Sequence, residues 1–343
     1  MYRMVASLLA ALVIVWVAGP RVIPMLRKLH FGQTIYELAP ETHKKKQGIP
    51  TMGGLMVVAA VVLCSVVFHY GPWYGWQDMT VALLAVSLLS MLVGFTDDFN
   101  KVVRKRNMGL TPMQKIVGQT VVAVLFSVYC YLHPLIGSKI LVPFANVEWD
   151  LGVFYIPLVA LLIIFMVNSS NLLDGLDGLL CCVSSVSFTA WGTMALIMMT
   201  LVSGAGSAQY SAGFYNMGIF CTAVTGAMMA FMTFNFYPAK VFLGDTGSMF
   251  IGGATVGLAL VMRQPIMLVL IDFTMIASSG SVIIQRTYFK LTHGKRIFKM
   301  SPIHHHFELC GYSEAQIDVM YAVLTGILSI IAIASLYGLK LIH

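Results

Sequence analysis

The sequence carries little charge. Only 10% of its 343 residues are Asp, Glu, Lys or Arg, whereas a soluble domain carries about 25%. Hydrophobic residues make up 58% of the chain, and the mean hydropathy is +0.84. No charged stretch is long enough to form a separate soluble domain, so the composition predicts a single integral-membrane domain over residues 1–343.

Metal-type cysteine motifs and visible internal repeats are also missing. The six cysteines include no CxxC pair of the kind that binds zinc. We therefore interpret them as packing residues, and the sequence gives no evidence of disulfides. The lack of a visible repeat weighs against a transporter, because many transporters are built from two related halves.

Long apolar runs are abundant. They are continuously apolar rather than alternating, which favours helices over a closed barrel. Many of them approach or exceed the roughly 20 residues that a helix needs to cross a bilayer. We expect an all-α polytopic membrane protein with about ten transmembrane helices, near residues 4–26, 51–70, 79–97, 112–133, 155–171, 178–202, 213–234, 246–262, 266–289 and 313–340.

The Lys and Arg residues predict the orientation. With the N-terminus outside, all but four of the 21 fall on the cytoplasmic side, as the positive-inside rule requires. The four outside residues are Arg3, Lys139, Arg263 and Lys340. We expect an N-out, C-out topology, and we attribute the net charge of +7 to inter-helix loops and anionic ligands rather than to nucleic acid.

A polar segment lies between two apolar runs at residues 168–178. Asn168, Asn171, Asp174 and Asp177 recur every three residues. On one helix such positions are surface neighbours, so the four groups would form a polar stripe. Polar groups at membrane depth usually face a water-filled cavity and indicate function. The stripe is therefore the first candidate for an active site.

Two further acidic motifs come from other helix ends on the cytoplasmic side. Asp97 and Asp98 end the third predicted span, where they could bind Mg²⁺, act as a base, or simply be solvated. Asp245 opens the eighth span and could hold a cation bridging phosphates. Thr246 or Ser248 could cap that helix. This convergence predicts an active site at the cytoplasmic face.

The remaining candidates are basic or amide groups. His304, His305 and His306 are adjacent, which does not fit the i, i+4 spacing of a helical zinc site. They could instead donate hydrogen bonds or charge to phosphates. Asn235 could read a base edge, although a helix-capping role suits it better. Asp272 lies inside the ninth span, where the sequence shows no partner for it.

Taken together, six stretches resemble the phospho-N-acetylmuramoyl-pentapeptide transferase family, within the polyprenyl-phosphate N-acetylhexosamine-1-phosphate transferases. They are Pro50–Gly54, Asp97–Lys101, Arg106–Leu110, Asn168–Gly178, Phe242–Ser248 and His304–Glu308. The resemblance covers almost the whole chain. The three histidines followed by Phe-Glu, together with the Pro50–Gly54 stretch, favour this family over relatives that use N-acetylglucosamine. One departure is Ile49, where the family usually has Thr.

The resemblance implies an enzyme of the bacterial cytoplasmic (inner) membrane, with ten helices and a homodimeric state. It implies transfer of phospho-N-acetylmuramoyl-pentapeptide from UDP-N-acetylmuramoyl-pentapeptide to undecaprenyl phosphate, which gives lipid I and UMP and requires Mg²⁺. The catalytic positions that it implies are Asp97, Asp98, Lys115, Asp174, Asp245, His304 and His305, with Asp245 as metal ligand and Asp97 and Asp98 as further candidates. The substrate-binding positions are Lys46, Lys101, Asn168, Asn171, Asp174, Asp177, Asn235, Phe242, His305 and His306.

The mechanism and two rival functions stay open at this point. The acceptor is already an anionic oxygen nucleophile, so we favour a one-step transfer with Asp98 as base over a two-step route through a covalent aspartyl intermediate. One rival is a sister enzyme that uses UDP-N-acetylglucosamine. The other, from a different class, is an anion transporter, although the charges here lie at one face rather than at the midplane.

Overall fold

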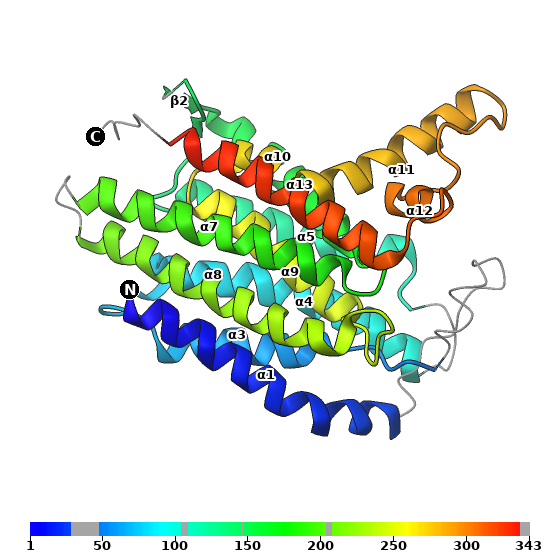
Figure 1. Ribbon diagram of the computed structural model, residues 1–343. Helices are drawn as coiled ribbons and strands as arrows, with labels where there is room; N and C mark the ends of the chain where they lie inside the picture. Colours follow the sequence, from blue (N-terminus) through cyan, green and yellow to red (C-terminus); the bar gives the residue numbers. More distant parts are fainter. Residues whose placement is uncertain (29–47, 104–108, 146, 204–207, 337–343) are drawn as a thin grey trace.

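The computed structural model describes residues 1–28, 48–103, 109–145, 147–203 and 208–336. Most of these residues lie in long helices that run side by side (Figure 1). The long helices are α1 (Tyr2–Lys28), α3 (Gly54–Val67), α4 (Met79–Val103), α5 (Pro112–Leu132), α6 (Tyr155–Leu173), α7 (Leu179–Ser203), α8 (Ala208–Asn235), α9 (Gly244–Val261), α11 (Phe273–Leu291) and α13 (Glu314–Ala334).

The short elements connect these helices. They are the 3₁₀ turns η1 (Gly75–Gln77), η2 (Gly152–Phe154) and η3 (Pro265–Met267), the short helices α10 (Leu268–Ile271) and α12 (Ile303–Glu308), and the strands β1 (Lys139–Val142) and β2 (Val147–Asp150). The two strands pair antiparallel, with Ile140 opposite Trp149. Arg263 Nη2 lies 2.7 Å from Glu148 Oε1 and so fastens this hairpin to the segment after α9.

The structure confirms an all-α polytopic membrane protein. Every predicted span overlaps a helix, and seven of the described helices are long and apolar enough to cross a membrane. The number ten and the orientation stay predictions. The tenth span is shorter than expected, because α13 ends at Ala334. The six cysteines are free thiols, and only Cys310 among them is exposed.

Helix α9 lies at the centre of the bundle. All of its side chains except Asp245 are buried, and α3, α4 and α6 pack around it. Small residues allow this close approach, as they commonly do between membrane helices. A Cβ on Gly94 of α4 would collide with the backbone carbonyl of Asp245, and a Cβ on Gly54 of α3 would collide with the backbone of Gly247. The ends of α3 and α4 therefore lie directly against the start of α9.

The ninth span is broken, contrary to the prediction of a continuous helix. A bend of 87° at Asp272 separates residues Pro265–Ile271 from α11. The carboxylate of Asp272 is buried and accepts hydrogen bonds from two α7 side chains, Ser187 Oγ at 2.5 Å and Trp191 Nε1 at 3.0 Å. The partners that the sequence did not reveal are therefore on α7, and they hold the break in place.

We predict that Asp272→Ala destabilises the protein by about 2 kcal/mol, because it leaves the buried Trp191 N–H without an acceptor. Asp272→Asn should be milder, since the amide oxygen can accept from Trp191 while the amide nitrogen donates to the Ser187 hydroxyl. Thermal unfolding of the purified protein in detergent measures both. Equal melting temperatures for the wild type and the Ala variant would contradict this role.

Candidate active site

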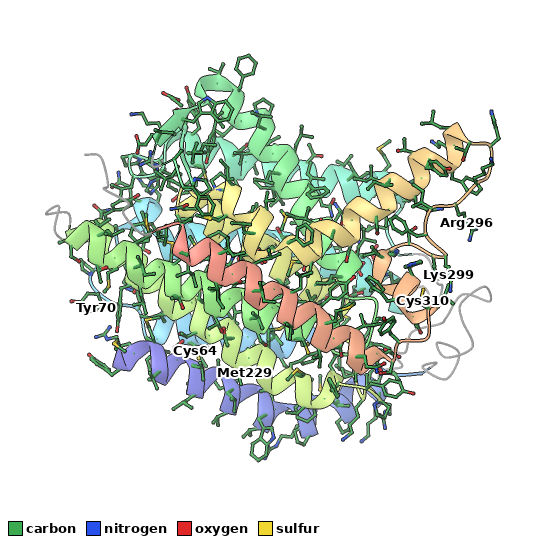
Figure 2. The ribbon with its side chains drawn as sticks, turned by 45° about the horizontal axis from the view of Figure 1, so that its top comes forward. Cys64, Tyr70, Met229, Arg296, Lys299 and Cys310 are labelled. Atoms are coloured by element: carbon green, nitrogen blue, oxygen red, sulfur yellow. The ribbon has the colours of Figure 1, made fainter. Side chains whose placement is uncertain are left out.

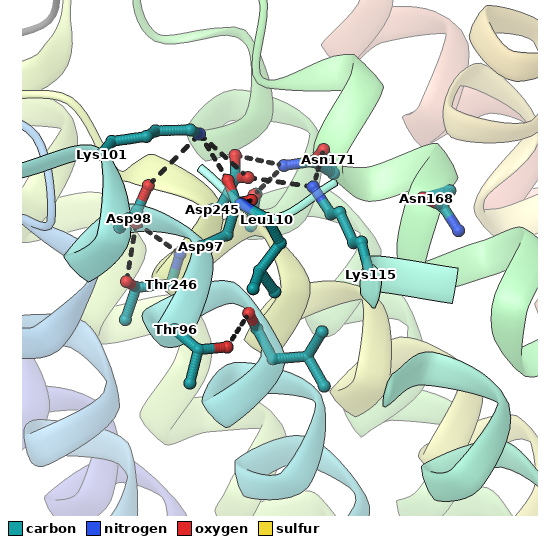
Figure 3. Close-up of polar contacts among 12 residues, drawn as sticks. Thr96, Asp97, Asp98, Lys101, Leu110, Lys115, Asn168, Asn171, Asp245 and Thr246 are labelled. Carbon is teal, nitrogen blue, oxygen red and sulfur yellow. Dashed lines mark hydrogen bonds and ion pairs between the residues drawn. The ribbon is translucent and has the colours of Figure 1, made fainter. Parts of the chain in front are cut away.

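Four helix ends meet at one end of the bundle (Figure 3). The end of α4 carries Asp97, Asp98 and Lys101, and the first turns of α5 carry Lys115. The end of α6 carries Asn171, and the first turn of α9 carries Asp245. Side chains that lie up to 148 residues apart in the sequence are thus within hydrogen-bonding distance of one another.

Asp245 is the centre of this group. Its Oδ2 lies 2.9 Å from Lys115 Nζ and 3.2 Å from Lys101 Nζ. Its Oδ1 accepts a hydrogen bond of 2.8 Å from Asn171 Nδ2. Asn171 also donates to Ser248 Oγ at 2.9 Å and accepts from Lys115 at 3.2 Å. Each carboxylate oxygen therefore has a donor from another helix, which offsets the cost of removing the charge from water.

Asp97 joins the end of α4 to the start of α5. Its Oδ2 lies 2.6 Å from Lys101 Nζ, and its Oδ1 accepts from the Leu110 backbone N–H at 2.8 Å. Thr111 then caps α5 in a capping box with Gln114. The carboxylate thus fixes the chain just before the helix that delivers Lys115.

Asp98 caps α9 from outside that helix. Its Oδ2 accepts from the Thr246 backbone N–H at 2.9 Å and from the Thr246 hydroxyl at 2.7 Å. The first N–H groups of a helix have no partner within it, and a negative charge there is favourable. The expectation that Thr246 or Ser248 caps α9 is wrong, because the cap residue is Leu243 and makes no side-chain bond. The carboxylate from α4 does this instead.

The residues present fit a hard divalent cation. One carboxylate oxygen from each of Asp97, Asp98 and Asp245 lies within 4.8 Å of the others, and Mg²⁺ prefers such oxygen ligands. Lys101 Nζ already lies among them, 2.6 Å from Asp97 Oδ2, 3.2 Å from Asp245 Oδ2 and 3.8 Å from Asp98 Oδ1. Three carboxylates against two ammonium groups leave the cluster with a negative balance that favours a further cation.

The predicted polar stripe is confirmed for Asn168 and Asn171 but is wrong for Asp174 and Asp177. Helix α6 ends at Leu173 with Asp174 as its C-cap, so only Asn168 and Asn171 share a helix face. Asn168 pairs with Gln119 of α5, at 2.8 and 3.3 Å, away from Asp245 (Figure 3). Asp177 is buried in the turn, where its Oδ2 accepts from the Ala239 backbone N–H at 2.9 Å.

Asp174 stays close to the cluster although it leaves the helix. Burial raises the pKa of Asp174 well above its ordinary value, and the nearby carboxylates of Asp245, Asp98 and Asp177 raise it further. A backbone hydrogen bond from Gly244 opposes these effects. The α6–α7 turn therefore contributes one acid to the site.

The histidines of α12 approach this turn from another side. A Cβ on Gly175 would lie 2.6 Å from His304 Nε2 and 3.4 Å from His305 Nε2. His305 Nδ1 lies 3.1 Å from Glu308 Oε2, so a carboxylate orients the ring with Nε2 towards the turn. His306 differs, because its Nδ1 accepts from the Lys299 backbone N–H at 3.1 Å.

Asn235 and Phe242 belong to the wall next to the turn. Asn235 is buried, and its amide accepts from the Gly178 N–H at 3.1 Å and donates to the Val241 carbonyl at 2.9 Å. This arrangement matches the helix-end role that the sequence favoured. Phe242 is half-buried, and its N–H donates to the Pro50 carbonyl at 2.8 Å. Lys46 lies outside the described residues.

Three hydrogen-bond partners were not predicted from the sequence: Gln119 for Asn168, Ser248 for Asn171 and Glu308 for His305. Gln119 lies four residues after Lys115, so the two share one face of α5. Glu308 likewise lies three residues after His305. Helical spacing from a known site residue was the signal that could have found both.

The sequence is similar to those of known transferases. Residues 79–263 match the model of a family described as glycosyl transferase family 4. The phospho-N-acetylmuramoyl-pentapeptide-transferase of Clostridium novyi (strain NT) is 40% identical over 336 residues, which is 98% of this chain and 98% of that protein. The protein of the same name from Halalkalibacterium halodurans is 41% identical over 316 residues, 92% of each chain. That from Clostridium perfringens (strain 13 / Type A) is 39% identical over 334 residues, 97% of this chain and 99% of that one.

We predict that Gly94→Ala loosens the site, because the added methyl pushes α4 away from the Asp245 backbone. Overpacking of this kind costs about 1 to 3 kcal/mol. Gly280→Ala is the matched control, since a Cβ there meets nothing within 4 Å. Thermal unfolding in detergent should show a lower melting temperature for Gly94→Ala only. A drop of the same size in both variants would argue against a specific contact.

We also predict that Glu308 sets the tautomer of His305. In the neutral ring of the wild type, Nδ1 carries the proton that Glu308 accepts. Glu308→Ala should shift the proton towards Nε2, whereas Glu308→Gln keeps an acceptor and should retain it. Nitrogen chemical shifts of labelled histidine, assigned with His305→Gln, measure this. A His305 signal that is the same in all three proteins would contradict the pairing.

Proposed function

Since the chain belongs to the phospho-N-acetylmuramoyl-pentapeptide-transferase family of peptidoglycan synthesis, we propose that the cluster around Asp245 is where it carries out this transfer. The observation that carries the proposal is the convergence of three carboxylates and two ammonium groups from α4, α5 and α9. Phosphoryl transfer depends mainly on positioning and on charge stabilisation, and this cluster supplies both.

The donor in this proposal is UDP-N-acetylmuramoyl-pentapeptide, and the acceptor is undecaprenyl phosphate. The products are lipid I and UMP. A phosphate oxygen of the acceptor forms a bond to the sugar-linked phosphorus of the donor, and the bond from that phosphorus to the UMP oxygen breaks. Both reactants are anionic, which suits a site whose lysines, Lys101 and Lys115, reach in from two helices.

A magnesium ion would be held by Asp245, with Asp97 and Asp98 as further ligands. When bound, Mg²⁺ would neutralise charge on the pyrophosphate and on the leaving UMP. The chain's own residues share that task. Lys101 and Lys115 would turn from Asp245 towards phosphate oxygens, and His305 Nε2 faces the same region from the α12 side.

We favour a one-step transfer. Asp97 is a poor nucleophile in this arrangement, because one of its oxygens is held by Lys101 and the other by the Leu110 N–H. Asp98 uses Oδ2 to cap α9, which leaves Oδ1, 3.8 Å from Lys101 Nζ, as the atom that could take a proton from the acceptor phosphate. The roles of the two acids are thus different although they are adjacent.

The uridine end of the donor would lie against the α6–α7 turn and the start of α9. Asn171, Asp174 and the half-buried Phe242 are the side chains proposed to contact it. The amide of Asn235 is engaged within the protein, so its proposed role is to shape this wall through Gly178 and Val241. Further polar positions retained from the resemblance are Lys46, Asn168, Asp177, His304 and His306.

The proposed setting is the bacterial cytoplasmic membrane, with the site facing the cytoplasm. Support comes from the chain's Lys and Arg residues, most of which fall on the side of the predicted topology that carries Asp97, Asp98 and Asp245. A homodimer is proposed from the resemblance alone. The sister enzyme and the transporter are not favoured, because the relatives named above span nearly the whole chain and share one transferase name.

We predict that the purified protein releases UMP from UDP-N-acetylmuramoyl-pentapeptide in the presence of undecaprenyl phosphate and Mg²⁺, and not from UDP-N-acetylglucosamine. Asp245→Asn should lower this rate by about 100-fold or more, because it removes the central charge of the cluster. Asp150→Asn, in the hairpin, is the control and should leave the rate unchanged. Faster release from UDP-N-acetylglucosamine would indicate the sister activity, and solute flux without UMP release would indicate a transporter.

A further inference from the structure

Helix α11 leaves the bundle and projects sideways at the end that carries the active site (Figure 1). The bend of 87° at Asp272 turns it away from the direction of η3 and α10. Its far end and the segment that returns to α12 form a protrusion, and Figure 2 shows Arg296 and Lys299 on it. We call residues 280–300 the basic arm.

Hydrogen bonds hold the two segments of the basic arm together. Gln285 Oε1 accepts from the backbone N–H groups of Ile297, at 3.1 Å, and Phe298, at 2.9 Å. Ser281 Oγ accepts from the Ile303 N–H at 2.9 Å. These bonds fasten the returning segment to α11, so the arm and α12 should move together.

The charge of the arm has one sign. The sequence contains no Asp or Glu between Asp272 and Glu308. Its five basic side chains are exposed, and none forms a salt bridge with another residue that the structure describes. They are Arg286, Lys290, Lys295, Arg296 and Lys299. Such a cluster attracts an anionic surface.

Large apolar side chains are exposed on the same arm. Leu291 is 75% exposed, Ile283 is 56% exposed and Ile297 is 48% exposed. Water alone would not favour such exposure so close to the basic residues. A helix with basic and apolar side chains side by side is typical of segments that lie in the headgroup region of a bilayer, with the apolar groups inserted and the bases at the phosphates.

We propose that the basic arm docks on anionic phospholipid headgroups of the leaflet at the active-site end of the same membrane. The sideways direction of α11 places the arm along that leaflet instead of out into the solvent. The apolar side chains enter the leaflet and the five bases bind lipid phosphates. An acidic protein surface would match the bases but not the exposed Leu291, Ile283 and Ile297.

Docking has a consequence for the site. The arm continues into α12, whose His304 and His305 lie against Gly175 of the α6–α7 turn. An arm held at the lipid surface therefore holds these histidines in place. This second step rests on the proposed function, whereas the docking itself does not.

Hydrogen exchange of the full chain in lipid nanodiscs tests the docking without any turnover. The discs contain either phosphatidylcholine alone or equal amounts of phosphatidylcholine and phosphatidylglycerol. Backbone amides of residues 286–299 should exchange at least about fivefold more slowly in discs that contain phosphatidylglycerol than in discs of phosphatidylcholine alone. High salt should remove this difference.

The test variant combines Arg286→Gln, Lys290→Gln, Lys295→Gln and Arg296→Gln, and it should exchange at the same rate in both kinds of disc. Lys299 is kept, because its Nζ donates to the Leu309 carbonyl. The matched control combines Arg21→Gln, Arg27→Gln and Lys28→Gln at the end of α1 and should behave as the wild type. Exchange that is independent of phosphatidylglycerol in the wild type would overturn the proposal, as would slowing that persists in the test variant.

Discussion

The rest of the structure depends on the ion pairs that Asp245 forms with two lysine ammonium groups. A largely buried carboxylate is costly unless it is paired and hydrogen-bonded, and Lys101 and Lys115 come from different helices. The pairing is possible only because α4 passes α9 without a side chain at Gly94. The bundle therefore brings its charges together where its backbones are closest, and the resulting negative balance suits a cation that could in turn bind anionic phosphates.

The same cluster separates positioning from chemistry. Asp98 completes the first turn of α9 by accepting from Thr246, and Asp97 fixes the chain before α5 by accepting from Leu110. Both acids thus hold the elements that deliver Asp245 and Lys115. Substituting either acid would disturb the geometry as well as the reaction, so loss of activity alone does not identify a base or a nucleophile. Gly94→Ala removes no polar group of the cluster, so its effect on activity reports the altered geometry alone.

The helices could be predicted from the sequence, because apolar runs determine helices in a membrane. The meeting of Asp97, Asp98 and Asp245 at one end of the bundle could be predicted as well, because the acidic motifs fall at helix ends. The positions of Asp174 and Asp177 could not be predicted, because the predicted polar stripe assumed that α6 continues through Asp174. Gly178, with a φ of +86°, and Asp174 as C-cap form a turn there instead. The break at Asp272 was hidden for a related reason. Asp272 is the only charged residue between Arg263 and Arg286, and the side chains that hold the break, Ser187 and Trp191, belong to α7. Contacts of this kind depend on packing between segments that are far apart in the sequence.

We propose that the carboxylates of α4 and α9 together form one cation site. Electron paramagnetic resonance of Mn²⁺, used in place of Mg²⁺, tests it on the purified protein without substrates. We expect one Mn²⁺ bound for each chain in the wild type and in Asp150→Asn, and a loss of most of that binding in Asp245→Asn. Equal Mn²⁺ binding in all three proteins would contradict it, because the cation would then lie elsewhere in the molecule.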